Sequence, residues 1–89
     1  MEITKSKKIA IVILNWNGSA LMERYLPSVV RYSPAEWADV IVADNGSTDD
    51  SLQMLADKFP SVQIIRMDKN YGFAEGYNQA LKHITHPYC

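Results

Sequence analysis

The sequence is short of cysteine, of net charge and of long apolar runs, and each shortage excludes a class of protein. A single cysteine among 89 residues, Cys89, excludes a disulfide framework and argues against a cysteine-based zinc site. The formal net charge of −1 provides no electrostatic basis for nucleic-acid binding. The apolar run at residues 9–14 is too short to span a membrane, and no small-residue cleavage site follows it. One small domain of ordinary composition is therefore expected.

Two common phosphate-binding patterns are also missing. No glycine-rich turn follows the first apolar run, and Gly72 and Gly76 are wrongly placed for a dinucleotide fingerprint. No P-loop pattern occurs either. These absences disfavour a nicotinamide-dependent enzyme and a protein that binds nucleotide phosphates through a P-loop.

Three apolar segments rich in β-branched residues alternate with three segments of helical periodicity. The apolar segments, at residues 9–14, 40–43 and 62–67, are typical of strands covered on both faces. Helical spacing follows each of them, over residues 21–30, from 49 or 50 to 59, and over 74–84. Pro27 predicts a kink or a second short helix, and Pro60 ends the middle helix. This order predicts a parallel sheet with right-handed crossovers, half of a doubly wound α/β fold.

All three strand-to-helix loops should open at the carboxyl edge of that sheet, where ligands bind in open α/β folds. The loops, at residues 15–18, 44–49 and 68–72, are rich in Asn, Asp and Gly. Asp44 ends a strand, so its carboxylate can accept hydrogen bonds from a nucleotide base or ribose. It can also serve only as a turn residue. Asn45 and Gly46 alone would suggest a hairpin, but the helical pattern after them argues against one.

Other polar and aromatic residues have simpler interpretations. Asp49 and Asp50 are predicted to cap a helix rather than bind a metal, and Ser47 or Thr48 can share that capping. Trp16 lies at a strand end, where it can stack on a ligand. The remaining candidates are interpreted as packing residues (Trp37, Tyr25, Tyr77) or as surface and capping histidines (His83, His86).

Three motifs in order carry a family resemblance. They are Ile-Val-Ile-Leu-Asn-Trp-Asn-Gly at 11–18, Val-Ala-Asp-Asn-Gly-Ser-Thr-Asp at 42–49, and Asn-Tyr-Gly-Phe-Ala-Glu-Gly-Tyr-Asn at 70–78. Together they resemble the N-terminal segment of family-two inverting glycosyltransferases of the GT-A fold. The most similar subgroup is the rhamnosyltransferase-like enzymes of bacterial cell-surface polysaccharide synthesis. The resemblance implies half of a Rossmann-like three-layer fold with strand order 3-2-1.

The same resemblance implies a donor site for a UDP- or dTDP-sugar. In it, the loop from Asn15 through Trp16 to Asn17 lines the base and ribose, and Asp44 accepts a hydrogen bond from the imide N–H of uracil or thymine. Asn45 belongs to the same nucleotide site. The remaining members, which flank the base and the diphosphate, are Asn70, Gly72 and Asn78.

The family's catalytic groups fall outside these motifs. The resemblance implies a divalent metal, Mg²⁺ or Mn²⁺, held by an Asp-x-Asp-like motif beyond residue 89, and a base carboxylate further along. Residues 1–8 are then a basic lead-in and 9–89 the nucleotide-binding part, truncated before the metal motif. No catalytic residue or metal ligand is assigned in this piece, which is expected to be inactive alone.

For the intact enzyme, the resemblance implies inverting transfer of a hexosyl group to a glycan or lipid-linked acceptor. The resemblance also implies that the intact enzyme acts in the cytoplasm, at the inner face of the membrane. Truncation leaves the first strand as an apolar edge, which predicts self-association. The alternative is a non-enzymatic half-Rossmann module that binds nucleotides or another protein. Titration with UDP, dTDP and NAD separates the two hypotheses.

Overall fold

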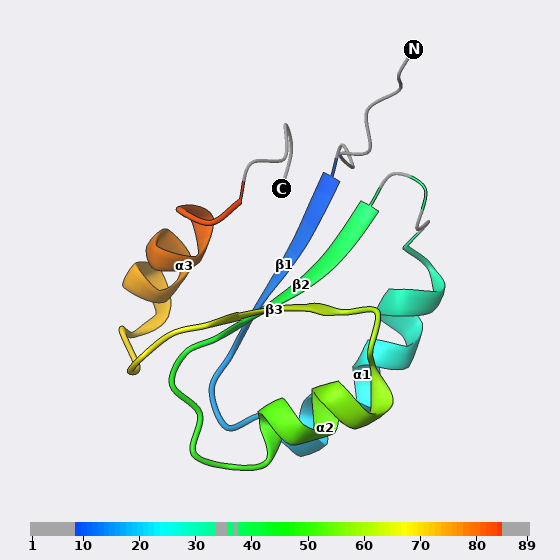
Figure 1. The fold of residues 1–89 in the computed structure, drawn as a ribbon, viewed down its shortest axis with the longest axis horizontal. Helices are drawn as coiled ribbons and strands as arrows, with labels where there is room; N and C mark the ends of the chain where they lie inside the picture. The colour runs from blue at the N-terminus through cyan, green and yellow to red at the C-terminus, as the bar shows by residue number, and fades with distance from the viewer. Residues whose placement is uncertain (1–8, 34–35, 37, 85–89) are drawn as a thin grey trace.

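In the computed structural model, which describes residues 9–33, 36 and 38–84, three strands alternate with three helices (Figure 1). This alternation confirms the order predicted from the apolar and helical patterns. The strands are β1 (Ile9–Asn15), β2 (Ala38–Asp44) and β3 (Gln63–Arg66). The helices are α1 (Ser19–Arg31), α2 (Ser51–Lys58) and α3 (Phe73–Leu81).

The sheet is parallel throughout, with β2 between β1 and β3. Counted from the other side, this is the predicted order 3-2-1. The register aligns the last residues of the three strands, because Asn15 pairs with Asp44 and Asp44 pairs with Arg66. All three loops that follow the strands therefore start from one edge, as expected.

Helices cover both faces of the sheet, which gives the three-layer arrangement (Figure 1). Helices α1 and α2 lie on one face and α3 lies on the other. The larger core cluster, which includes residues of α1, β2 and α2, contains Met22, Leu26, Val40, Val42, Met54, Leu55 and Val62. The smaller cluster under α3 contains Ala43, Met67 and Ala80. Because side chains alternate along β2, Val42 and Ala43 face opposite layers.

Small residues let α3 approach the sheet closely. Gly76 and Ala80 are its buried residues. A Cβ atom on Gly76 would lie 2.8 Å from Asn45 Nδ2 and 3.2 Å from the methyl carbons of Leu14. The close contact brings the start of α3 next to the loop that follows β2.

Pro27 does not divide α1, so the prediction of a second short helix is wrong. The helix continues from Ser19 to Arg31 with Pro27 inside it. Proline removes its own N–H donor and its ring crowds the carbonyl one turn back, but here the residue itself is exposed to solvent. The buried side chains of Met22 and Leu26 hold the preceding turns against the sheet, which outweighs the lost hydrogen bond.

The ends of α2 and α3 and the packing of the two tyrosines agree more closely with the predictions from the sequence. Helix α2 ends at Lys58, before Phe59 and Pro60. Helix α3 ends at Leu81, three residues earlier than expected. Tyr25 packs against the larger cluster, whereas Tyr77 is half-buried and meets the ring of Phe73 edge-on at 5.2 Å between centroids.

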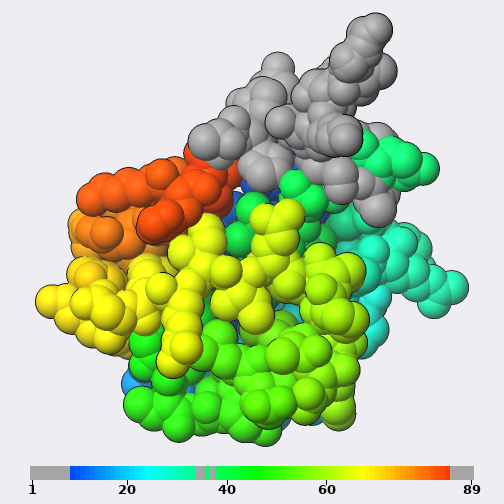
Figure 2. All heavy atoms as spheres, in the orientation of Figure 1, coloured from blue at the N-terminus to red at the C-terminus, as the bar shows by residue number. Residues whose placement is uncertain are grey.

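The two outer strands of the sheet differ in character. Strand β3 lies on the surface between α2 and α3 in Figure 2, and its Gln63, Ile64 and Arg66 are exposed. Strand β1 is longer and carries no charged residue. Among the described residues, β1 pairs with β2 alone, and no helix there is long and apolar enough to cross a membrane.

Candidate functional site

The loops after β1 and β2 are joined by hydrogen bonds around the carboxylate of Asp44. Asn15 Nδ2 donates to Asp44 Oδ1 at 2.9 Å and to Ser47 Oγ at 3.1 Å. The Ser47 hydroxyl donates to Asp44 Oδ1 at 2.7 Å, and the Ser47 backbone N–H donates to Asp44 Oδ2 at 3.0 Å. Asp44 therefore closes its own turn and also holds the end of β1.

Asn17 adds a second connection between the same two loops. It has a left-handed backbone (φ 53°), which asparagine tolerates better than most residues. Its Oδ1 accepts from the backbone N–H groups of Thr48 at 2.7 Å and Asp49 at 3.1 Å. Its own backbone N–H donates to Ser47 Oγ at 2.9 Å. The two loops are thus fixed to each other along several residues.

Asn45 connects the β2 loop to the loop before α3. Its Oδ1 accepts from the backbone N–H of Tyr71 at 2.9 Å. Its Nδ2 donates to the carbonyl of Gly72 at 3.0 Å and to Asn70 Oδ1 at 3.3 Å. Next to it, Gly46 (φ 78°) lies directly against the backbone of Lys69 and Asn70. All three loops therefore form one hydrogen-bonded edge.

Burial divides the predicted site residues into two groups. Three side chains are buried, with exposed fractions of 4% for Asn15, 1% for Asp44 and 2% for Asn45. The others are half-buried or exposed, namely Trp16, Asn17, Asn70, Gly72 and Asn78. The structure brings seven of the eight to the loops of one edge. Asn78 lies on α3, outside the hydrogen bonds described above.

Asp49 joins the N-termini of two helices. Its Oδ2 accepts from the backbone N–H of Ser19, the first residue of α1, at 3.2 Å. Its Oδ1 accepts from the backbone N–H of Ser51, the first residue of α2, at 2.9 Å, and from the Ser51 hydroxyl. The predicted capping role is confirmed for Asp49. Asp50 stands at the predicted N-cap position of α2, but its side chain makes no cap hydrogen bond.

These contacts change the pKa of Asp49. Desolvation raises the pKa, but the hydrogen bonds from Ser51 and Ser19 together outweigh it and lower the pKa below its ordinary value. Nearby, the hydrogen bond from the Tyr71 hydroxyl to Asp68 raises the pKa of the tyrosine and lowers that of the aspartate. The carboxylates of Asp49 and Asp68 therefore stay ionised at neutral pH.

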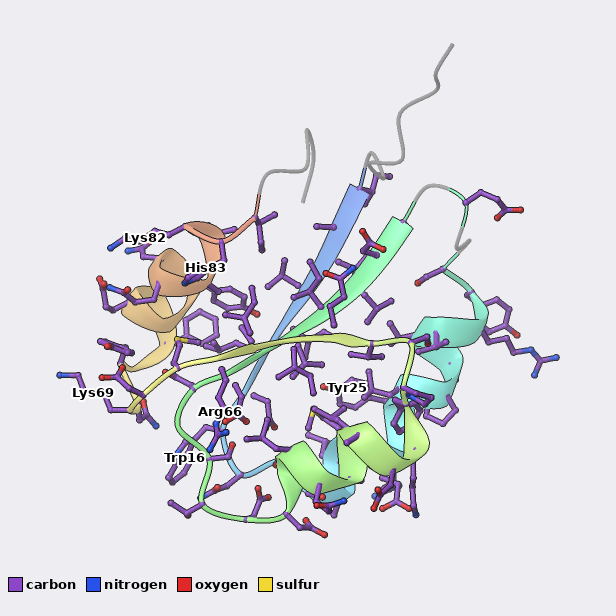
Figure 3. All side chains as sticks on the ribbon, in the orientation of Figure 1. Trp16, Tyr25, Arg66, Lys69, Lys82 and His83 are labelled. Carbon is purple, nitrogen blue, oxygen red and sulfur yellow. The ribbon has the colours of Figure 1, made fainter. Side chains whose placement is uncertain are left out.

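The sequence did not lead us to predict Arg66 as a site residue, and it led us to predict only a capping role for Ser47. Arg66 ends β3 in register with Asp44, and it shares a sheet face with Asn15 and Asp44. Figure 3 shows Arg66 and Trp16 at the same end of the sheet. The strand pattern contained a signal for Arg66, since a strand's last residue reaches the ligand edge. Ser47 was considered only for capping, although the turn role open to Asp44 implies a hydrogen bond to a backbone N–H a few residues further on.

The remaining candidates lie away from this edge or outside the described residues. His83 is exposed after the end of α3, as expected of a surface residue. Trp37 and His86 fall outside the described residues. In the described part of the chain, no three His, Cys, Asp or Glu residues are grouped so that they could hold a metal ion. These residues do not fit a metal centre.

A parallel α/β half-domain with polar loops joined at the carboxyl edge belongs to the Rossmann-like class, whose ligands bind at that edge. Within this class, the chain belongs to glycosyl transferase family 2, whose family model matches residues 10–89. The resemblance of the three motifs to family 2 is thereby confirmed.

One curated relative and one solved structure are similar to this chain. An uncharacterized glycosyltransferase from Bacillus subtilis (strain 168), YfnE, is 37% identical over 78 residues, which cover 84% of this chain and 20% of that protein. The fold resembles that of a mannosyltransferase from Pyrobaculum calidifontis, PcManGT, solved in complex with GDP-Man and Mn²⁺. That match has a TM-score of 0.75 at 24% identity and covers 92% of this chain and 26% of the other. The chain thus spans about a quarter of the length of either protein or less.

Proposed function

We propose that this chain forms the nucleotide half of the donor site of a glycosyltransferase. The enzyme moves a hexosyl group from a UDP- or dTDP-sugar to a glycan or lipid-linked acceptor, with inversion, as rhamnosyltransferase-like enzymes do. We place this reaction in the cytoplasm at the inner face of the membrane. One observation carries the proposal: the three loops at the carboxyl edge are joined through Asp44 and Asn45, while the Trp16 ring remains 55% exposed.

The exposed groups at this edge match the parts of a nucleotide. The indole of Trp16 offers a surface on which a base can stack. We propose that Asn70 and Gly72 on the next loop, with Asn78 on α3, flank the base and diphosphate of a bound donor. A guanidinium can donate two parallel hydrogen bonds to the oxygens of one phosphate group, so Arg66 can contribute to binding a charged donor.

We assign the chemical step to parts of a glycosyltransferase outside the segment that this chain covers in the proteins it matches. A divalent metal supplies electrostatic stabilisation of the leaving diphosphate when it is bound. We assign this chain to binding and orienting the nucleotide, because its three polar loops are joined at the carboxyl edge of the sheet. We expect the 89-residue chain to bind nucleotides weakly and to transfer no sugar.

Nucleotide titration with a tryptophan variant tests this proposal. We expect UDP or dTDP to bind more tightly than NAD, and Trp16→Ala to weaken the binding about tenfold, because stacking contributes about 1–3 kcal/mol per base. Tyr32→Ala is the control, since Tyr32 is 75% exposed just after the C-terminus of α1. Isothermal titration calorimetry gives the affinities. A preference for NAD, or equal effects of the two variants, would favour the non-enzymatic half-Rossmann alternative.

We also propose that the chain self-associates through β1. This seven-residue strand has no charge or proline to block pairing, whereas the four-residue β3 carries Arg66. Ile9→Lys, at the first residue of β1, should weaken association about tenfold by placing a charge on the strand that pairs. Ile64→Lys on β3 is the matched control. Sedimentation velocity over a concentration series measures both variants, and a wild-type chain that stays monomeric throughout contradicts the proposal.

A further inference from the structure

We propose that Asp44 is a positioning residue of the donor site rather than the group that reads the base. It acts through Ser47 to hold the loop that carries Trp16 and Asn17. This inference rests on the proposed nucleotide site, and it reverses the role that the family resemblance implied for the carboxylate.

The first argument is that the carboxylate is already occupied. The exposed fraction of Asp44 as a whole residue is 1%. Oδ1 accepts from Asn15 Nδ2 and from the Ser47 hydroxyl, and Oδ2 accepts from the Ser47 backbone N–H. A base N–H needs an oxygen that it can approach within about 3 Å. The carboxylate is enclosed by these donors and presents almost no surface at which a base could meet it.

The second argument concerns the direction of the hydrogen bonds. Two partners of Ser47 Oγ are N–H groups, which only donate: the backbone N–H of Asn17 at 2.9 Å and Asn15 Nδ2 at 3.1 Å. The Ser47 hydroxyl therefore donates its single hydrogen to Asp44 Oδ1. Asp44 thus fixes how Ser47 holds the β1 loop. Trp16 lies between the two asparagines that Ser47 binds.

An amide at position 44 breaks this arrangement with little change in volume. Whichever way the amide is turned, its NH₂ group faces at least one N–H donor, either the Ser47 backbone N–H or Asn15 Nδ2. Asp44→Asn therefore weakens the connection between the loops. Ser47→Ala removes the hydroxyl and leaves the carboxylate in place. If Asp44 acts through Ser47, both changes must loosen the Trp16 loop.

The first experiment needs no nucleotide. In a Trp37→Phe background, the only tryptophan emission comes from Trp16, and acrylamide quenching reports the accessibility of its ring. We expect Asp44→Asn and Ser47→Ala each to raise the quenching constant about twofold. Asp50→Asn is the control, because it removes a charge from the same loop at a residue without a cap hydrogen bond. Unchanged quenching in both test variants would overturn the proposal, and Ser47→Ala still decides it if Asp44→Asn does not fold.

The second experiment separates positioning from base reading. The affinities of UDP and N3-methyl-UDP are measured for the wild-type chain, Asp44→Asn and Ser47→Ala. A positioning role predicts that both affinities fall together, about tenfold, and that their ratio is the same in all three proteins. Direct reading predicts that methylation lowers affinity in the wild type and that Asp44→Asn abolishes this difference. That result would overturn the proposal.

A failure of the proposed function can be distinguished from a failure of the positioning role of Asp44. If the wild type prefers a guanine nucleotide, GDP and N1-methyl-GDP form the equivalent pair, since guanine carries the same kind of N–H. If no nucleoside diphosphate binds, the proposed nucleotide site is wrong. The quenching experiment then still shows whether Asp44 and Ser47 hold the Trp16 loop.

Discussion

Gly46→Ala is expected to lower the free energy of unfolding by about 2 kcal/mol or more. Gly46 has a φ of 78°, in the left-handed region that disfavours a Cβ atom. The added Cβ would lie 2.6 Å from the carbonyl carbon of Lys69 and 2.7 Å from the backbone nitrogen of Asn70. These are backbone atoms, so relief requires the loops after β2 and β3 to move apart. Urea denaturation followed by circular dichroism measures the loss.

Gly72→Ala is the control for this prediction. Gly72 also has a positive φ, of 81°, and its ψ of −179° lies in a region that is essentially restricted to glycine. Apart from its chain neighbours, no atom of the described residues lies within 4 Å of the position that a Cβ would take there. Alanine at Gly72 should therefore cost about 1–3 kcal/mol for the backbone conformation alone, whereas at Gly46 the contact with the other loop adds to the backbone cost. A smaller loss for Gly46→Ala than for Gly72→Ala would show that the loops do not meet as the structure places them.

The two glycine variants also separate stability from binding. Displacing the loop after β2 should disturb the contacts of Asn45 with Tyr71 and Gly72, and with them the nucleotide affinity. The measurement uses temperatures at which both variants remain folded, so that any loss of affinity reflects the loop and not unfolding. We expect the larger loss for Gly46→Ala.

Asp49→Ala is expected to lower the free energy of unfolding by about 1–2 kcal/mol at neutral pH. The value lies high in the range for a helix cap, because the carboxylate accepts from the first residues of both α1 and α2. Asp50→Ala is the control and should change stability by less than about 0.5 kcal/mol. Asp50 is exposed and makes no side-chain cap hydrogen bond. Chemical denaturation of the three proteins decides between these expectations.

The contribution of Asp49 should depend on pH with a definite sign. Its pKa is lowered in the folded chain from an ordinary value of 3.8. A lowered pKa stabilises the fold at pH values above the unfolded pKa and loses that effect as the pH falls through the folded pKa. The difference in stability between the wild type and Asp49→Ala should therefore be constant near neutral pH and shrink below about pH 4. A difference that persists unchanged at about pH 2.5, well below the ordinary carboxylate pKa, would contradict the ionised cap.

Local patterns in the sequence predicted the elements well, because strand and helix signals depend on neighbouring residues. The runs that became β1 and β2, and the stop at Pro60 after α2, follow from periodicity and from the chemistry of proline. Pro27 shows the limit of such reasoning. Its penalty is local, but the burial of Met22 and Leu26 against the sheet is a tertiary effect, and it keeps α1 in one piece.

By itself, the sequence determined the parallel α/β order, the family and the meeting of three polar loops at one edge. These conclusions rest on periodicity and on motifs that are continuous in the chain. Only the tertiary structure decided which polar side chains are enclosed at that edge and which remain exposed. Asp44, Ser47 and Asn17 come together across a span of about 30 residues, and Arg66 joins their edge only through the register of β3. Burial and hydrogen-bond partners depend on the packing of distant segments. Asp44, which its motif predicts to bind a base, is therefore found enclosed by hydrogen-bond donors of the protein itself.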